Sequence, residues 1–252
     1  MRKIAAMLGA LALVAIAALA WAAVGRAGSP KADNLPPFGP GNNYQPTIER
    51  QDFSPNVTNR WFPLTPGTTL TYEGTKDGEP ARNLFAVTAR TKLIDGVRCR
   101  VVFDQLFLSG RLAERTFDYY AQDDDGNVWY FGEDTVARDD QGNLTDTEGS
   151  FRAGVDGAQP GLFMQAHPEI GRTFRQEWYQ GHAEDRFKVV SRSARVTVPY
   201  GSFHPAVRTE ERTDLEPEVL DNKYYVRGIG EVTEASITGP LEKLELVAVT
   251  KS

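Results

Sequence analysis

The sequence predicts an all-β domain: a curved antiparallel sheet in the form of an open (half) barrel or a two-sheet sandwich of about ten strands. Three observations predict this fold. Short runs of alternating apolar and polar residues extend from residue 69 to the C-terminus, Asp-Gly and Ser-Gly pairs separate several of them, and no segment after residue 27 repeats apolar residues with a helical period. Many short strands with little helix must form a sheet that curves round on itself or packs on a second sheet.

The first 27 residues predict a signal peptide. Arg2 and Lys3 precede an uncharged stretch rich in Ala and Leu, and both Ala20-Trp21-Ala22 and Gly25-Arg26-Ala27 fit the small-residue pattern of a cleavage site. The alternative is an uncleaved anchor, because about 20 apolar residues are enough to span a bilayer. Both alternatives place the rest of the chain outside the cytoplasm, secreted or periplasmic.

Residues 28–55 predict a Pro/Gly-rich linker or arm, and residues 56–252 a single β-rich domain. Five prolines lie between residues 28 and 46, among glycines and asparagines, and proline removes backbone hydrogen-bond donors. β barrels and sandwiches often run to roughly 200–250 residues without division. Apolar residues make up 40% of the chain, which is enough for a hydrophobic core.

The first strands are expected as alternating segments joined by short turns. Asp77-Gly78, Asp95-Gly96 and Ser109-Gly110 lie between them, and glycine accepts the positive φ that tight hairpin turns require. Consecutive strands joined in this way form an antiparallel meander. These strands are expected at residues 69–73, 84–93, 97–108, 111–122 and 128–133.

The alternation is lost over residues 138–170, where glycine and proline interrupt the chain repeatedly. We expect a long ordered loop or flap there, with one short strand, and long loops in compact domains are often functional. Cys99, the chain's one cysteine, alternates in phase with Val97, Val101 and Phe103, which predicts a buried and unpaired thiol. Strands are expected again at residues 173–179, 187–198, 206–213, 223–226, 230–238 and 244–250.

Three motifs support a resemblance to known proteins. The segments 59–64 (NRWFPL), 126–132 (GNVWYFG) and 224–230 (YYVRGIG) resemble a group of uncharacterised secreted bacterial proteins over roughly residues 56–252. The closing pattern, aromatic residues followed by Gly-x-Gly and two last strands, also resembles the half-barrel carriers that move lipoproteins or lipids through the periplasm. The resemblance implies a compartment and a fold, and it supplies no catalytic residue.

Aromatic residues provide the main candidates for ligand binding. Trp129 and Phe131 share one face of an expected strand, and Trp178-Tyr179 ends another. These four side chains predict a pocket for an apolar ligand, with the 138–170 loop as its lid. The alternative is a core of bulky side chains.

Catalytic and metal-binding motifs are weak by comparison. His182, Glu184 and Asp185 suggest a hydrolase as the alternative function, because an imidazole beside carboxylates serves general acid–base chemistry; a solvated turn explains the same residues. The acidic turn 123–127 lacks the glycine and glutamate positions of an EF-hand loop and is interpreted as a hairpin loop whose Asp and Asn accept backbone hydrogen bonds. No catalytic residue, metal ligand or cofactor is therefore assigned.

The sequence as a whole predicts an exported, non-catalytic binding protein for an apolar small molecule or an envelope protein. A secreted hydrolase and a structural cell-envelope protein remain as alternatives. The chain carries 28 Lys and Arg against 34 Asp and Glu, a net charge of −6, so no nucleic-acid partner is expected. Contact with a membrane is expected only through the signal segment if it stays uncleaved.

Overall fold

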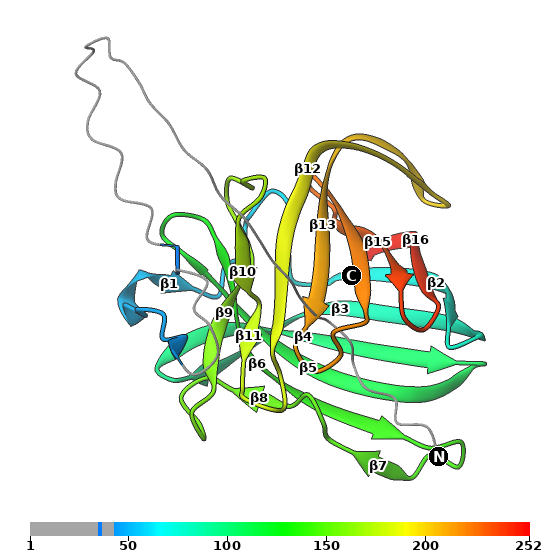
Figure 1. Cartoon of the computed structure of the whole chain (residues 1–252), viewed down its shortest axis with the longest axis horizontal. Coiled ribbons are helices and arrows are strands. Elements are labelled where there is room, and N and C mark those ends of the chain that lie inside the picture. Colours follow the sequence, from blue (N-terminus) through cyan, green and yellow to red (C-terminus); the bar gives the residue numbers. More distant parts are fainter. Residues whose placement is uncertain (1–34, 37–42) are drawn as a thin grey trace.

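In the computed structural model, which describes residues 35–36 and 43–252, the first half of the domain is an antiparallel meander (Figure 1). Its turns at Asp77-Gly78, Asp95-Gly96 and Ser109-Gly110 each hold two residues at positive φ, the geometry of a two-residue hairpin turn. The predicted meander is confirmed. Its strands are β2 (Thr68–Lys76), β3 (Glu79–Ile94), β4 (Val97–Leu108), β5 (Arg111–Asp123) and β6 (Val128–Arg138).

The C-terminal strands form a second antiparallel series that continues the same sheet. The last strand, β16, pairs with β2, so the end of the chain lies beside the start of the meander. The series consists of β12 (Asp185–Val198), β13 (Gly201–Thr213), β14 (Leu220–Val226), β15 (Gly230–Thr238) and β16 (Glu242–Lys251).

The segment 138–170 contains three short strands, β7 (Leu144–Asp146), β8 (Phe151–Arg152) and β9 (Gln159–Met164). All three pair with β6, which extends beyond the expected end at residue 133 and also pairs with β5 as far as Ala137. The expectation of a loop with one short strand was therefore wrong. Glycine and proline do end each strand after a few residues, but the free edge of β6 pairs with the backbone between these interruptions.

The two ends of the sheet are joined by β10 (Thr173–Arg175) and β11 (Glu177–Trp178), which are separated by one residue. β10 pairs with β12, and β11 pairs with β9. A Cβ on Gly161 of β9 would lie 2.1 Å from the carbonyl carbon of Gln176, so glycine is needed for this close approach. Because β10 and β11 are consecutive, the sheet forms a nearly closed barrel.

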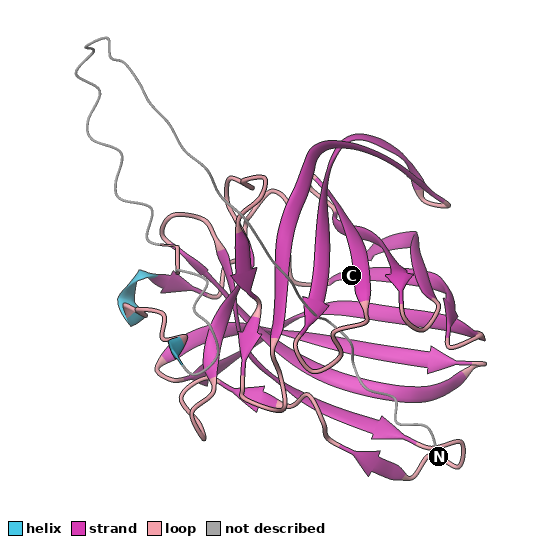
Figure 2. Cartoon of the chain, viewed as in Figure 1, coloured by secondary structure: helices cyan, strands magenta, loops and turns pink. Residues whose placement is uncertain are grey.

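The all-β fold and its barrel form are thus confirmed, with a higher strand count than the sequence predicted. Thirteen strands follow one another along the sheet of the described residues, against about ten expected. Figure 2 shows strands throughout the domain and helix only near its N-terminal end. The additional strands are the short ones of residues 138–178.

The described part of the predicted arm packs against the barrel. Tyr44 is buried and donates a hydrogen bond from its hydroxyl to the Pro160 carbonyl oxygen at 3.0 Å. A 3-10 turn, η2 (Arg50–Asp52), leads into β1 (Phe53–Ser54), which pairs with β5. The predicted signal segment, residues 1–27, lies outside the described residues. No helix of the described residues is long and apolar enough to cross a membrane.

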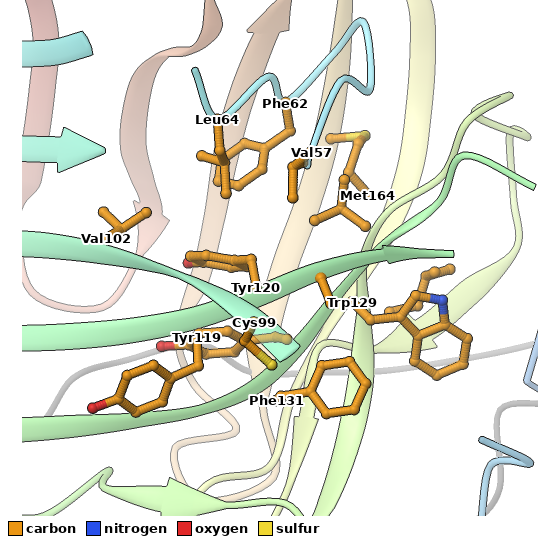
Figure 3. Packing of buried hydrophobic residues seen from close by; sticks show 14 of the residues in the cluster. Val57, Phe62, Leu64, Cys99, Val102, Tyr119, Tyr120, Trp129, Phe131 and Met164 are labelled. Atoms are coloured by element: carbon orange, nitrogen blue, oxygen red, sulfur yellow. The ribbon is translucent and has the colours of Figure 1, made fainter. Parts of the chain in front are cut away.

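The sheet is buried on both faces where β4, β5 and β6 meet the arm. Figure 3 shows Tyr120 on one side of these strands and Cys99 and Phe131 on the other. Cys99 is buried and unpaired, as predicted, and burial raises the pKa of its thiol. A second hydrophobic cluster, which includes Leu70 and Leu246, fills the half of the barrel near β2 and β16.

Candidate functional site

A cavity of about 220 Å³ lies inside the barrel, where the two hydrophobic clusters meet. Its walls come from both halves of the sheet and from the segment that precedes β2. The apolar and aromatic lining consists of Phe62, Pro63, Leu64, Leu70, Tyr72, Phe85, Tyr120, Tyr130, Phe163, Leu215, Ile229 and Leu244.

Aromatic rings form one wall of this cavity. Tyr120 of β5 stacks on Tyr130 of β6, with ring centroids 4.7 Å apart, and Phe163 of β9 contacts Tyr120 edge-on at 5.0 Å. Phe62 lies 4.5 Å from Phe163 and 5.3 Å from Tyr120. Stacked and edge-on pairs are arrangements that aromatic rings prefer, so the wall is well packed with the cavity empty.

A β-bulge in β6 decides which side chains face the cavity. Tyr119 pairs with Gly132, whereas Tyr120 pairs with Tyr130, so Phe131 is an extra residue in the strand. Gly132 has φ of 144°, and a Cβ there would lie 2.4 Å from the Phe151 carbonyl oxygen. Because the bulge reverses the alternation, both Tyr130 and Glu133 line the cavity.

Tyr130 connects two carboxyl groups at the cavity wall. Its hydroxyl lies 2.6 Å from Asp118 Oδ1 and 2.7 Å from Glu133 Oε2. One phenol has a single hydrogen to donate, so the second contact requires a proton on a carboxyl group. Burial raises the pKa of Asp118 to about 7, and burial together with the charges of Glu177 and Asp118 raises the pKa of Glu133 well above its usual value.

Three further carboxyl groups of the cavity, those of Glu177, Asp185 and Glu231, also have raised pKa values. Glu177 and Asp185 share a hydrogen bond, which again requires a proton, and burial raises the pKa of both groups well above the usual range. Burial likewise raises the pKa of Glu231 to about 8. The carboxyl groups that line the cavity are those of Asp104, Asp118, Glu133, Glu177, Asp185, Glu231 and Glu234.

Lys223 is the one lysine or arginine among the described residues that line the cavity, and it already has partners. Its Nζ lies 3.4 Å from Glu211 Oε2 and 3.3 Å from Glu234 Oε1. Burial alone would lower the pKa of Lys223, but these carboxylates outweigh it and raise that pKa well above normal. Glu211 also accepts hydrogen bonds from Thr209, Gln176 and Tyr225. This cluster is therefore a satisfied buried ion pair.

Trp129 and Phe131, two of the residues predicted to bind ligand, lie together on the outer face of the sheet. Both rings contact Phe53 edge-on, at 5.9 and 5.3 Å. Trp129 Nε1 donates a hydrogen bond to Asp123 Oδ2 at 2.9 Å. They are buried residues that support the wall from behind and do not line the cavity.

Trp178 and Tyr179 are separated from that pair and from the cavity lining. Trp178 is buried with the Arg175 guanidinium 4.1 Å from its ring centre. Tyr179 is half-buried and lines a shallow surface pocket with Asp134 and Arg152. Ligand binding by the four predicted aromatic residues stays a prediction.

The residues of the alternative hydrolase function have separate partners. His182 stacks on Tyr179 at 4.5 Å, and its Nδ1 lies 3.1 Å from Glu148 Oε1. Glu184 Oε1 accepts a hydrogen bond from the Gly181 backbone nitrogen at 2.7 Å and so closes the turn. Asp185 is buried against Glu177 and lines the cavity, as does His182.

The acidic turn 123–127 is held by its own side chains. Asp123 Oδ1 accepts a hydrogen bond from the Asn127 backbone nitrogen at 2.8 Å, and Asp123 Oδ2 accepts one from Asn127 Nδ2 at 2.9 Å. These bonds confirm the interpretation as a hairpin loop. Among the described residues, no group of three or more His, Cys, Asp or Glu side chains is arranged to hold a metal ion.

The comparisons with known proteins add a likeness of fold. No protein-family model matches the chain, and no curated protein is significantly similar in sequence. A candidate exported protein with a YmcC-like fold from Bacteroides fragilis is 14% identical, with a TM-score of 0.45, over 76% of this chain and 99% of that chain. A candidate lipoprotein from Parabacteroides distasonis is 9% identical, with a TM-score of 0.42, over the same shares.

Proposed function

We propose that this chain is an exported, non-catalytic binding protein that holds a small ligand with an apolar part inside its barrel. The cavity behind the Tyr120–Tyr130 wall carries the proposal. An apolar cavity of about 150 Å³ is enough to bind benzene, so a space of about 220 Å³ accommodates a somewhat larger molecule. The N-terminal segment, with its basic start and small-residue cleavage patterns, supports export.

The well-packed aromatic wall supports binding by a preformed site. Tyr120, Tyr130, Phe163 and Phe62 contact one another and need no rearrangement to present apolar surface. A preformed site avoids the entropic cost of ordering side chains on binding, so a small ligand gains affinity from the area that it buries.

The neutral dye N-phenylnaphthylamine tests this function, because its fluorescence rises in an apolar environment. We expect saturable binding to the native protein and none to the denatured protein. Ile229, a turn residue at the cavity, allows a filling substitution: Ile229→Trp should weaken dye binding by roughly tenfold or more, the equivalent of about 1.4 kcal/mol.

Ile237 provides the matched control, because it is 58% exposed on the neighbouring strand β15. Ile237→Trp should leave dye affinity unchanged. An absence of dye binding, or an equal effect of the two substitutions, would contradict a ligand site inside the barrel.

A further inference from the structure

We infer, on the basis of the proposed ligand-binding function, that the ligand is an organic cation: an apolar or aromatic body with a protonated amine that binds between Asp118 and Glu133. The composition of the cavity is the first argument. Among the described residues, seven carboxyl groups line it, against one lysine that is already paired with Glu211 and Glu234. A cavity wall of this composition favours a positively charged guest over a neutral or negative one.

The hydrogen-bonding capacity of the wall gives the second argument. The Tyr72 hydroxyl donates to the Glu231 carbonyl oxygen at 3.0 Å, and Asn83 Nδ2 donates to Asp104 Oδ1 at 2.5 Å. The Tyr130 hydroxyl donates its one hydrogen to one of Asp118 and Glu133 and accepts a hydrogen bond from the other. These donors already have acceptors whereas Asp118 Oδ2 has none, so a ligand that donates a hydrogen bond supplies what this part of the wall lacks.

Asp118 supplies an independent observation that points to a ligand. Its side chain is 6% exposed and lines the cavity, and its Oδ2 has no hydrogen-bond partner within the described part of the chain. A buried polar atom without a partner is costly, and the cost is larger for a charged group. Both Asp118 and Glu133 contact the same phenol oxygen, so their carboxyl groups lie close together at one point of the wall, where an ammonium group would lie near both.

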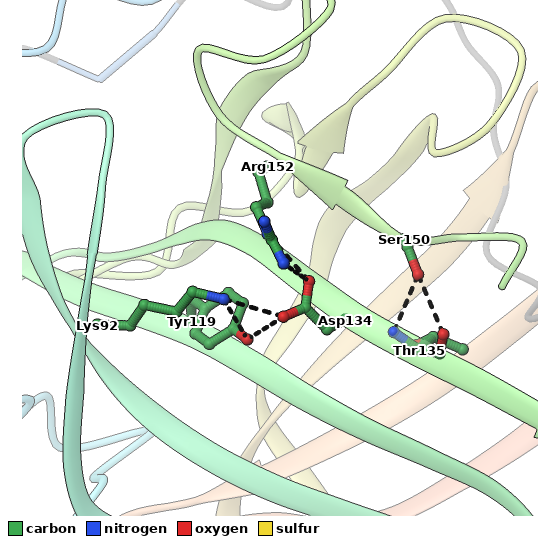
Figure 4. Close-up of polar contacts among 6 residues, drawn as sticks. All are labelled: Lys92, Tyr119, Asp134, Thr135, Ser150 and Arg152. Atoms are coloured by element: carbon green, nitrogen blue, oxygen red, sulfur yellow. Dashed lines mark hydrogen bonds and ion pairs between the residues drawn. The ribbon is translucent and has the colours of Figure 1, made fainter.

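The outer face of β5 and β6 carries a comparable cluster of a tyrosine and a carboxylate, and there the carboxylate has cationic partners. There Asp134 accepts hydrogen bonds from the Tyr119 hydroxyl at 2.5 Å, from Lys92 Nζ at 2.9 Å and from Arg152 Nη2 at 2.6 Å (Figure 4). The inner cluster has the tyrosine and the carboxyls and lacks the cations. An ammonium group from a ligand would pair with the inner carboxyls as Lys92 pairs with Asp134 on the outer face.

The aromatic wall accounts for the body of the ligand. Tyr130 belongs both to the carboxyl cluster and to the ring pair with Tyr120, so an apolar or aromatic body lies against rings when its ammonium reaches the carboxyls. The faces of these rings also attract cations, which adds to the same preference.

Three probes of similar size and different charge test the inference: phenethylamine, phenethyl alcohol and hydrocinnamate. Each would be titrated against the protein with bound N-phenylnaphthylamine at pH 7.5. We expect phenethylamine, which is protonated at this pH, to displace the dye with an affinity at least about tenfold higher than that of the alcohol, and hydrocinnamate to bind most weakly. Calorimetry in two buffers of different ionisation enthalpy should show proton release with the amine and none with the alcohol.

Asp118→Asn keeps the shape of the side chain and removes its charge. It should lower the affinity for phenethylamine to about that for the alcohol, while dye and alcohol binding on the same variant establish that its cavity is intact. Asp140→Asn removes an equal charge from an exposed turn outside the cavity and should change neither affinity.

The outcomes separate this inference from the proposed function. Equal or tighter binding of the alcohol or of hydrocinnamate, or an amine preference that survives in Asp118→Asn, would overturn the cationic ligand and leave a binding cavity. Failure of the dye and of all three probes to bind would overturn both.

Discussion

Glu133 and Asp134 are neighbours on β6, and their carboxyl groups lie on opposite faces of the barrel wall. Asp134 faces outward, where burial would raise its pKa but hydrogen bonds from Tyr119, Lys92 and Arg152 hold it below the usual value. Glu133 faces the cavity, where burial and the nearby Glu177 and Asp118 raise its pKa well above the usual value. The same functional group is thus ionised and fully paired on one face, and short of partners on the other.

The difference separates a structural cluster from a site that is open to a ligand. Lys92 and Arg152 come from β3 and β8, so the outer cluster ties the meander to the short strands that follow it. The inner contacts of Tyr130 with Asp118 and Glu133 join only β5 and β6, which already pair through their backbones. Buried polar groups that lower stability without joining elements are typical of binding sites.

The largest effect expected on stability is on the outer face. Trp129→Ala should lower the free energy of unfolding by about 3–5 kcal/mol, the usual cost of truncating a packed aromatic residue, because Trp129 packs on Phe53 and bonds to Asp123. Chemical denaturation measures this loss. The variant's folded fraction should still bind N-phenylnaphthylamine with unchanged affinity. A mild loss of stability with loss of dye binding would instead support Trp129 as a ligand residue.

Strand β6 illustrates how far the sequence predicts the candidate site. Period-two alternation correctly groups Trp129 with Phe131 on one face and Val128 with Tyr130 on the other. It does not tell which face is the interior, because apolar residues occupy both faces and the arm covers the outer one. Alternation also does not predict that Glu133 faces the cavity, because the bulge at Phe131 shifts the pattern by one residue. The glycine at position 132 was the signal that could have indicated a bulge.

The next effect is a dependence of stability on pH that originates in the cavity. Burial raises the pKa of Asp118 to about 7 and that of Glu231 to about 8, so between about pH 4 and these values the folded protein holds protons that the unfolded chain has released. Stability should therefore be highest at acidic pH and fall as the pH rises to 8, by up to about 1.4 kcal/mol per pH unit for each such group. Denaturation at pH 5, 6, 7 and 8 measures the slope. A rise in stability over this range would contradict the donor-poor environment of these groups.

Asp118→Asn measures how much the Asp118 carboxyl group contributes to this dependence of stability on pH. At pH 8 the substitution should raise the free energy of unfolding by on the order of 2 kcal/mol, because it removes a carboxylate that is costly to ionise where it lies. At pH 4 the effect should be close to zero, since the native carboxyl is then protonated. Thermal denaturation at both pH values provides the measurement. A variant that is more stable at pH 8 and yet binds phenethylamine poorly would mark Asp118 as a residue kept for binding, whereas a loss of stability at pH 8 would assign it a structural role.

The fold was more predictable than the site, for a physical reason. Strand bounds such as Val97–Leu108 and Gly230–Thr238 follow from alternation and turn residues, which are local signals. One short strand was expected where β7, β8 and β9 lie, because all three pair with the edge of β6, a partner that their own short sequences do not reveal. Closure of the barrel depends on β10 pairing with β12 and β11 pairing with β9, two strands near opposite ends of the sheet. Pairing of this kind is set by the whole sheet.

The smallest effect concerns the carboxyl group on the outer face. Asp134→Asn should lower the free energy of unfolding at pH 8 by about 1 kcal/mol, the upper end for ion pairs near the surface, because Lys92 and Arg152 lose their charged partner. The pKa of Asp134 is lowered in the folded protein, so this contribution is present above about pH 4 and is lost as the pH falls through the folded pKa. High salt should reduce the loss, since Asp134 is one-third exposed. Asp140→Asn, which breaks an exposed pair with Arg111, should change the stability by less and serves as the control. The same substitution is thus expected to have opposite signs on the two faces at pH 8, and a gain in stability from Asp134→Asn would show that the outer cluster is no better paired than the inner one.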